Sequence, residues 1–258
     1  MSERLTTTVG EIVAADFRTA AVFERFGIDF CYGGRRSLTD ACRTAAADPD
    51  AVVHALDALP PTIETEDDVA RWPIPKLIDF IVSRHHAYVR SSMPTIARYL
   101  TKLEEVHGSR HPELSRVAAY FEQVRGDLER HMLMEEQVLF PYVRDLAERP
   151  DGCGRTQSPF GTVENPIRMM EREHREVADA LHIIRELTLG YTAPEDGCTT
   201  YAVCMAELQR FERDLHRHVH LENNVLFPKA IELEQLWPEE RQPKFEDERS
   251  VLENRQRE

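Results

Sequence analysis

The chain has 258 residues, 41% of them hydrophobic, which is enough for one large domain or for a large and a small one. Its formal net charge of -14 argues against nucleic acid and anionic membranes as main partners, because these polyanions would repel it. There is no apolar run of about 18 residues, and the amino-terminal stretch MSERLTTTVGEIVAADFR lacks the basic-then-apolar pattern of a signal peptide. We therefore expect a globular, cytoplasmic protein.

Residues 1–59 predict a small helical domain. Thr8 with Glu11, and Ser37 with Asp40, have the spacing of helix-start capping signals. The stretches AAVFERFG and LTDACRTAAA have helical character. A domain of this size has a small core, so we expect little stability from it in isolation.

Residues 60–75, PPTIETEDDVARWPIP, concentrate proline and acid and predict a linker. After it, four long segments of helical periodicity with turn-rich stretches between them predict an antiparallel four-helix bundle over residues 76–236. A charged tail follows over residues 237–258. Pro94, inside the first segment, predicts a kink or a break. The whole chain is thus expected to be all-α, with its long helices at roughly 75–107, 112–146, 164–189 and 198–236.

The five cysteines do not form a recognisable framework. Their number is odd, their spacing is irregular and no C-x-x-C occurs, so neither a disulfide pattern nor a zinc knuckle is predicted. We expect free thiols at Cys31, Cys42, Cys153, Cys198 and Cys204.

A repeat dominates the second domain. HMLMEEQVLFP, from residue 131, returns 87 residues later as HVHLENNVLFP, and the shared pattern extends upstream as D-L-x-R-H-x-x-x-E-x-x-V-L-F-P. Residues i and i+4 of a helix lie on one face, so His131 with Glu135, and His218 with Glu222, can each direct an imidazole and a carboxylate at one point.

Each copy has a further histidine upstream. His86 lies 45 residues before His131, and His174 lies 44 residues before His218, so the domain consists of two helix pairs of one plan. If these pairs pack about a pseudo-two-fold axis, six side chains converge between the four helices. They are His86, His131, Glu135, His174, His218 and Glu222.

The alternative is that the polar residues repeat only because a helix pair was duplicated, and that they face solvent. The apolar tail of the repeat argues against this, because Val138, Leu139 and Phe140 are expected in the core and an apolar face should not carry an unpaired carboxylate and imidazole. Asp127 and Asp214, one turn before their histidines, are candidates to accept the free ring N–H of a ligand.

Four imidazoles and two carboxylates without a thiolate suit iron or manganese better than a structural zinc. Carboxylates can bridge two metals, so the two-fold pattern predicts a dinuclear centre.

With these residues in hand, the domain resembles the hemerythrin-like cation-binding bundle, and HRHVHLENNVLFP is similar to the iron–sulfur cluster repair proteins of bacteria. The amino-terminal domain extends the resemblance, because that family carries D-[FY]-C-C-G-G-x-x-[ST]-L and this chain has DFCYGGRRSL at residues 29–38. Tyr32 replaces the second cysteine. The resemblance also includes EDGCTTY at residues 195–201 and covers the chain from about residue 5 to about residue 230.

The resemblance implies two non-haem irons held by the four histidines and bridged by the two glutamates, with an oxo or hydroxo group between them. It also implies a stress response in which the protein restores iron–sulfur clusters damaged by nitric oxide or oxidants, with damaged iron–sulfur proteins as clients and iron as the material supplied. Cys31 is a candidate thiolate whose pKa Arg35 and Arg36 would lower, and the alternative is a buried turn cysteine.

Three other interpretations stay open from the sequence. The centre could bind or sense oxygen, nitric oxide or peroxide without repair, or it could reduce nitric oxide as an enzyme. The amino-terminal domain could serve only to form a homodimer.

Overall fold

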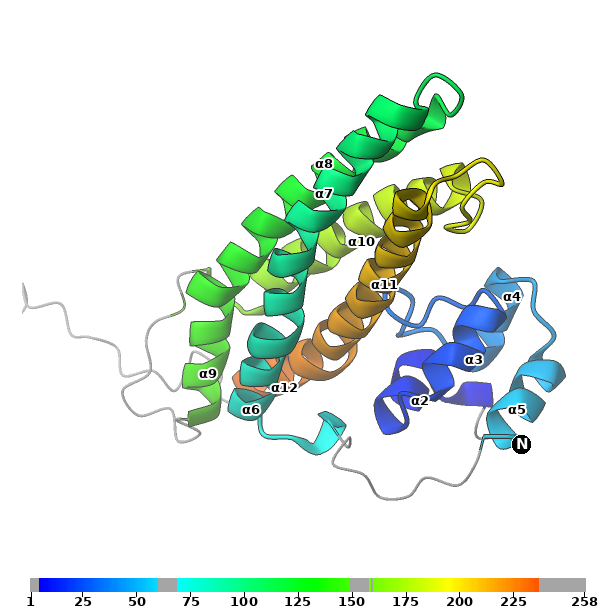
Figure 1. Cartoon of the computed structure of the whole chain (residues 1–258). Helices are drawn as coiled ribbons and strands as arrows, with labels where there is room; N and C mark the ends of the chain where they lie inside the picture. The colour runs from blue at the N-terminus through cyan, green and yellow to red at the C-terminus, as the bar shows by residue number, and fades with distance from the viewer. Residues whose placement is uncertain (1–4, 60–68, 149–157, 159, 237–258) are drawn as a thin grey trace, which may run out of the picture.

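The computed structural model describes residues 5–59, 69–148, 158 and 160–236 (Figure 1). Within these ranges the secondary structure is helical and no strand occurs, apart from an isolated bridge between Thr8 and Ser37. The prediction of an all-α protein with a small helical domain before a four-helix bundle is confirmed. Most of the predicted linker, at 60–68, and the predicted tail at 237–258 lie outside the described residues.

The amino-terminal module begins with the capping signals that the sequence predicts. Thr8 and Glu11 form a reciprocal capping box, in which the Glu11 N–H donates to Thr8 Oγ1 at 3.2 Å and the Thr8 N–H donates to Glu11 Oε2 at 3.0 Å. Ser37 Oγ accepts from the Asp40 N–H in the same way, at 3.1 Å. The module contains α2 (Val9–Ala15), α3 (Thr19–Arg25), α4 (Leu38–Thr44) and α5 (Pro49–Asp57).

The bundle consists of four long helical rods, three of which contain a π-helical turn. Each π turn begins or ends at one of the six predicted ligand residues: η2 ends at His86, η3 begins at Glu135 and η4 begins at Glu222. π-Helical turns of this kind are frequent at functional sites. After the 3-10 turn η1 (Val69–Arg71), the rods in chain order are α6 (Ile74–Phe80), η2 (Ile81–His86) and α7 (Ala87–His107); α8 (Glu113–Met134), η3 (Glu135–Leu139) and α9 (Phe140–Glu148); α10 (Glu164–Leu187); and α11 (Thr199–Leu221), η4 (Glu222–Leu226) and α12 (Phe227–Gln235).

Pro94 does not break the first rod, and the prediction of a split there is wrong. Helix α7 runs through it as one element, and the departure from α geometry lies in η2, directly before α7. Met93 and Ile96 on either side of the proline are fully buried in the bundle core. Their packing outweighs the one backbone hydrogen bond that a proline removes from a helix.

The apolar core of the bundle has two parts. One part fills the end where α7 meets α8 and α10 meets α11, and includes Phe121 and Phe211. The other fills the opposite end around α6, α9 and α12, and includes Phe140 and Phe227. On every rod the predicted ligand residues lie between these two parts, so the bundle contains one buried polar layer.

The amino-terminal module packs beside the lower half of α11 (Figure 1). Val219 of α11 belongs to the module's apolar core, and α2 contacts η4. Val225 of the second repeat is buried in the apolar core of the bundle, whereas its counterpart Val138 is only partly buried. The expectation that Val138 lies in the core is therefore wrong, and the two copies of the repeat have different surroundings.

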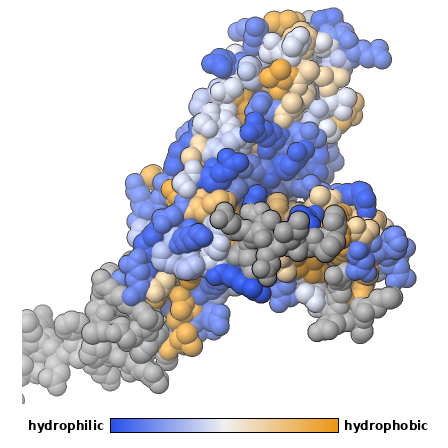
Figure 2. Space-filling view, turned by 60° about the horizontal axis from the view of Figure 1, so that its bottom comes forward, coloured by the Kyte–Doolittle hydropathy of each residue, from blue (hydrophilic) through white to orange (hydrophobic). Residues whose placement is uncertain are grey.

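Hydrophilic residues cover most of the bundle surface that Figure 2 shows, and hydrophobic ones form scattered patches. Among the described residues, no helix has the length and apolar character that crossing a membrane would require.

Candidate metal centre

The structure brings together all six residues that the repeat predicts. His86 comes from η2, His131 from α8, Glu135 from η3, His174 from α10, His218 from α11 and Glu222 from η4, and each is at least 97% buried. They form two groups of four ligand atoms that lie within 4.8 Å of one another, and both glutamates belong to both groups. The cluster is therefore two half-sites that share their carboxylates.

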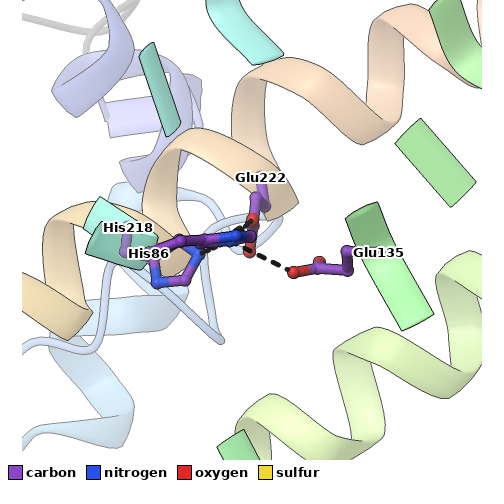
Figure 3. A group of neighbouring side chains, drawn as sticks. All are labelled: His86, Glu135, His218 and Glu222. Carbon is purple, nitrogen blue, oxygen red and sulfur yellow. Dashed lines mark hydrogen bonds and ion pairs between the residues drawn. The ribbon is translucent and has the colours of Figure 1, made fainter. Parts of the chain in front are cut away.

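The first half-site contains His86 and His218 (Figure 3). Their Nε2 atoms lie 3.1 Å apart. Glu135 Oε2 is 3.4 Å and Glu222 Oε1 is 3.7 Å from His86 Nε2, and Glu222 Oε1 is 2.9 Å from His218 Nε2.

The second half-site repeats this arrangement with the other oxygen of each carboxylate. His131 Nε2 and His174 Nε2 lie 2.9 Å apart, Glu135 Oε1 is 3.4 Å from the former and Glu222 Oε2 is 3.2 Å from the latter. Each glutamate thus directs one oxygen at each half-site, as a carboxylate that bridges two cations would.

The outer ring nitrogens determine where the imidazole protons lie. Glu136 Oε1 is 2.6 Å from His86 Nδ1, and Glu173 Oε2 is 2.8 Å from His131 Nδ1. Asn223 donates from Nδ2 to the Cys31 carbonyl, which leaves its Oδ1, 3.0 Å from His174 Nδ1, as the acceptor. Acceptors at Nδ1 place the proton of each neutral ring there and leave the lone pair on Nε2.

Neutral imidazoles in these tautomers would bring lone pairs face to face. His131 Nε2 and His174 Nε2 are 2.9 Å apart, so only a proton or a cation between them makes the contact favourable. Within the cluster, four more buried atoms have no hydrogen-bond partner among the described residues: both oxygens of Glu135, Glu222 Oε2 and His218 Nδ1. Buried polar atoms without partners are costly, and metal coordination would satisfy the three carboxylate oxygens. The donor set therefore fits a cation site.

Without a metal, the two carboxylates favour the protonated form of His86 and His131. Burial opposes charge on His86, but the carboxylates of Glu135 and Glu222 outweigh it and raise its pKa to about 10. Burial also opposes charge on His131, whose pKa Glu135 and Glu173 raise to about 10. Burial and the neighbouring carboxylate oppose ionisation of Glu135, yet the surrounding imidazoles lower its pKa to about 2. Glu222 behaves alike, with its pKa held well below the usual range.

The outer partners are not those that the sequence predicts. Asp214 contacts His85 Nδ1 at 3.1 Å, and Asp127 pairs with Arg130, so neither aspartate contacts a residue of the cluster. The sequence prediction did not include Glu136, Glu173 and Asn223 as the hydrogen-bond partners of the ligand histidines. The repeat does contain a signal for two of them. Glu136 and Asn223 directly follow the two glutamates at equivalent places in the repeat. Each accepts a hydrogen bond from the histidine upstream of its own copy, His86 for Glu136 and His174 for Asn223.

One position breaks the symmetry. Glu173, just before His174, bonds His131, and its counterpart in the other half is His85, just before His86. The His85 ring is stacked on that of His218 at 5.8 Å between centroids and does not bond its Nδ1. The two half-sites thus have the same types of ligand residue, but the partners at the Nδ1 atoms of their histidines differ.

The remaining histidines lie apart from the cluster. His220 is buried against Phe30, His216 contacts Glu24 at 3.5 Å, and His54 and His182 are exposed. His107 and His111 lie at the other end of the bundle.

Cys31 is a buried turn cysteine, and the prediction of a low pKa is wrong. Asp29 Oδ1 accepts from the N–H groups of Cys31 and Tyr32, and the Cys31 thiol donates to the His216 carbonyl at 3.1 Å. Burial raises the pKa of the thiol well above its usual value, and Arg35 is paired with Glu171. The loop forms one wall of a cleft of about 760 Å³ against α10 and α11.

A helical bundle with a buried, carboxylate-bridged imidazole cluster defines a class of cation-binding proteins, and comparison with known families agrees. Residues 77–230 match the hemerythrin HHE cation binding domain, and residues 5–60 match a domain of unknown function named ScdA_N. The chain belongs to the hemerythrin HHE family.

Its relatives include proteins named iron–sulfur cluster repair protein YtfE. That of Yersinia pestis (strain Pestoides F) is 34% identical over 224 residues, which are 87% of this chain and 96% of that protein. That of Yersinia pseudotuberculosis (serotype O:1b, strain IP 31758) has the same identity and coverage. The resemblance predicted from the repeat and from DFCYGG is confirmed.

Proposed function

We propose that this protein is a di-iron protein that repairs damaged iron–sulfur clusters by supplying iron. The observation that carries the proposal is the pair of shared carboxylates, each with one oxygen toward each histidine pair. The names and the near-complete coverage of its relatives support the repair function.

The donor set supports iron as the metal. Each half-site supplies four protein ligand atoms, two imidazole nitrogens and two carboxylate oxygens, without a thiolate. Imidazole and carboxylate suit a first-row metal such as iron, and four protein ligands leave coordination positions free on an ion that takes six. Iron bound there would supply redox chemistry and exchangeable positions.

The chain's own residues give the site two properties that suit temporary storage of iron. The outer partners at Nδ1 orient His86, His131 and His174, so that the Nε2 atoms converge before a metal arrives. The same imidazoles take up protons when the metal leaves, because the adjacent carboxylates raise the pKa of His86 and His131 to about 10. When a cation leaves, protonated histidines therefore pair with the two buried glutamates. The negative charges of these carboxylates are then not left unpaired in the interior.

The proposal requires two separate measurements. Metal analysis with Mössbauer spectroscopy of the loaded protein should give about two irons per chain in one coupled centre, and Glu222→Ala should lose the coupling. The ferrous protein should then reactivate an enzyme whose cluster nitric oxide has damaged, faster than an equal amount of ferrous salt. Glu222→Ala, loaded with whatever iron it retains, is the matched control.

Each rival function has its own outcome in these experiments. A stable, reversible oxygen or nitric oxide adduct without loss of iron would favour a binding or sensing protein. Formation of nitrous oxide over many turnovers would favour an enzyme. Reactivation no faster than that by free ferrous salt would contradict repair while leaving the metal assignment intact.

A further inference from the structure

A cysteine and a histidine form a close pair at the end of the bundle remote from the metal centre. Cys198 is the N-cap of α11 and is exposed, and His107 is the last residue of α7 and only 3% exposed. His107 Nε2 lies 3.2 Å from Cys198 Sγ. Cys198 precedes His218 by 20 residues on the same rod, which places the pair about 30 Å along the bundle from the cluster.

Arg110 determines which nitrogen of His107 carries the proton. A guanidinium only donates hydrogen bonds, and Arg110 Nη2 lies 3.4 Å from His107 Nδ1. Nδ1 is therefore the acceptor and the ring proton is on Nε2, where it points at the sulfur. A sulfur that accepts a hydrogen bond in this way is favoured as a thiolate.

The ring of His107 is also held from the sides. Tyr201 packs edge to face against it with centroids 5.6 Å apart, and His111 does so at 6.4 Å. Asp196 binds Arg110 at 3.0 Å and His111 at 3.0 Å, and Glu113 binds His111 at 2.9 Å. Both acids are thus paired with basic groups, and the ring of His107 is packed on two sides.

The helix adds to the effect. Cys198 lies at the start of a 23-residue helix, where backbone N–H groups point outward and favour a negative charge. The hydrogen bond from His107, with smaller contributions from the N–H groups of Tyr201 and Thr200, lowers the pKa of Cys198 to about 7.

The other described cysteines behave in the opposite way. Cys31, Cys42 and Cys204 are buried, and burial raises the pKa of each thiol. Cys153 lies outside the described residues. Cys198 is therefore the one cysteine among those described that is both exposed and paired with a donor.

We propose that Cys198, oriented by His107 and Arg110, is a reactive thiol that forms mixed disulfides with low-molecular-weight disulfides. The thiolate attacks one sulfur of the disulfide, a new S–S bond forms at Cys198 and the original S–S bond breaks. The departing thiolate takes a proton from solvent. Cys198 is oxidised and one sulfur of the small disulfide is reduced, so no further oxidant is needed, and a second thiol reverses the step.

The expected rate advantage can be calculated. At pH 7, a thiol with a pKa of about 7 is about half ionised and one with the ordinary value of 9.0 is about 1% ionised, which is a ratio of about 50. The lower basicity reduces the nucleophilicity of the sulfur about eightfold over this range. Cys198 should therefore react with small disulfides about sixfold faster than an ordinary exposed thiol.

The test uses the full-length protein and reads each cysteine separately. The protein is labelled briefly with iodoacetamide between pH 5 and pH 10 and then digested, and mass spectrometry measures the labelled fraction of each cysteine peptide. Cys198 should react with an inflection near pH 7. Oxidised glutathione at pH 7 should add a glutathionyl group to the Cys198 peptide before the peptides of Cys31, Cys42 and Cys204, and a thiol reductant should remove it.

Two variants test whether His107 itself, and not its neighbour His111, lowers the pKa of Cys198. His107→Leu keeps an apolar side chain against the ring of Tyr201 but removes the hydrogen-bond donor to Cys198. The pH at which Cys198 labelling inflects should therefore rise toward 9. His111→Leu removes the neighbouring imidazole, which does not contact the sulfur, and should leave the inflection close to that of the wild type. Circular dichroism checks that both variants are folded.

The proposal would be overturned by a wild-type inflection near 9, by a Cys198 that glutathione disulfide leaves unmodified, or by a folded His107→Leu variant with an unchanged inflection. If His107→Leu does not fold, the wild-type inflection and the order in which the cysteine peptides react still decide the outcome.

Discussion

Replacing Asn223 with alanine should weaken metal binding at one half-site. Asn223 Oδ1 is the acceptor for His174 Nδ1, and His174 is only 2% exposed, so the variant leaves a buried N–H without a partner. An unsatisfied buried donor costs about 1–3 kcal/mol. The ring can avoid this cost by moving its proton to Nε2, but that atom then cannot bind a metal.

Metal binding at Nε2 fixes the proton on Nδ1, so the bound state bears this cost while the free ring can avoid it through the other tautomer. Metal affinity at the half-site of His131 and His174 should therefore fall by up to this amount, which is roughly 5- to 150-fold. The assay is an anaerobic titration with ferrous ion in the presence of a chromophoric chelator that competes for it. Asn223→Ala should show one metal bound as in the wild type and one bound more weakly.

Two control variants identify the cause. Asn223→Asp keeps an acceptor for His174 and loses the donor to the Cys31 carbonyl, so its affinity should stay at or above that of the wild type. Asn224→Ala removes the bonds to the carbonyls of Phe30 and Cys31 but contacts no residue of the cluster, so both metals should bind normally. Superimposable titrations for Asn223→Ala and the wild type, or equal losses in Asn224→Ala, would refute the reasoning.

Three further predictions concern the cluster and the module. Glu222→Ala should weaken both metals, because its two oxygens face different half-sites, whereas His131→Ala should weaken mainly one, and elemental analysis after desalting should give fewer metals for the former. In the metal-free protein, the pKa of His86 and of His131 is raised from 6.5 to about 10, so their stabilising effect is complete below pH 6.5 and is lost as the pH rises through about 10. The Tm of the metal-free protein should therefore fall between pH 7 and pH 10, and the double variant with leucine at both positions should lose this slope. Finally, Gly34→Ala should loosen the module, because a β-carbon there would overlap Asn224 Oδ1. Limited proteolysis between the module and the bundle should become faster than in Gly126→Ala, where the added β-carbon would make only an ordinary contact of 3.6 Å with Arg130 Nη1.

Contrary outcomes are equally concrete. Retention of one full metal by Glu222→Ala would show that its carboxylate is not shared. A metal-free Tm that rises toward pH 10 would mean that the imidazoles are neutral in the folded state. Equal proteolysis rates for the two glycine variants would mean that Asn224 moves aside without cost.

The inner cluster was predictable because helix geometry converts sequence spacing into direction. His131 with Glu135, and His218 with Glu222, are four residues apart on helices, and the duplication supplied the second half. The start of α2 was predictable for a similar reason, since a capping box is a contact between residues three apart.

The outer shell was not predictable in this way, because its contacts join different helices. Glu173 of α10 bonds His131 of α8, and the relative rotation of two rods is set by packing that no local spacing records. The same holds for Cys31, whose basic neighbours in sequence suggested a reactive thiol. The thiol is buried by α11, a helix almost two hundred residues away in the chain.

The amino-terminal module sits on only one of the two repeats, and this has an evolutionary consequence. His220 and Leu221 are buried where their counterparts Leu133 and Met134 are 48% and 42% exposed. Two copies that began as equals therefore face different selection: the outward side of the second has become interior and can change only together with the module, while that of the first is free to drift. Substitutions should accumulate faster at Leu133 and Met134 than at His220 and Leu221. The second copy should therefore keep more of the sequence that both copies inherited.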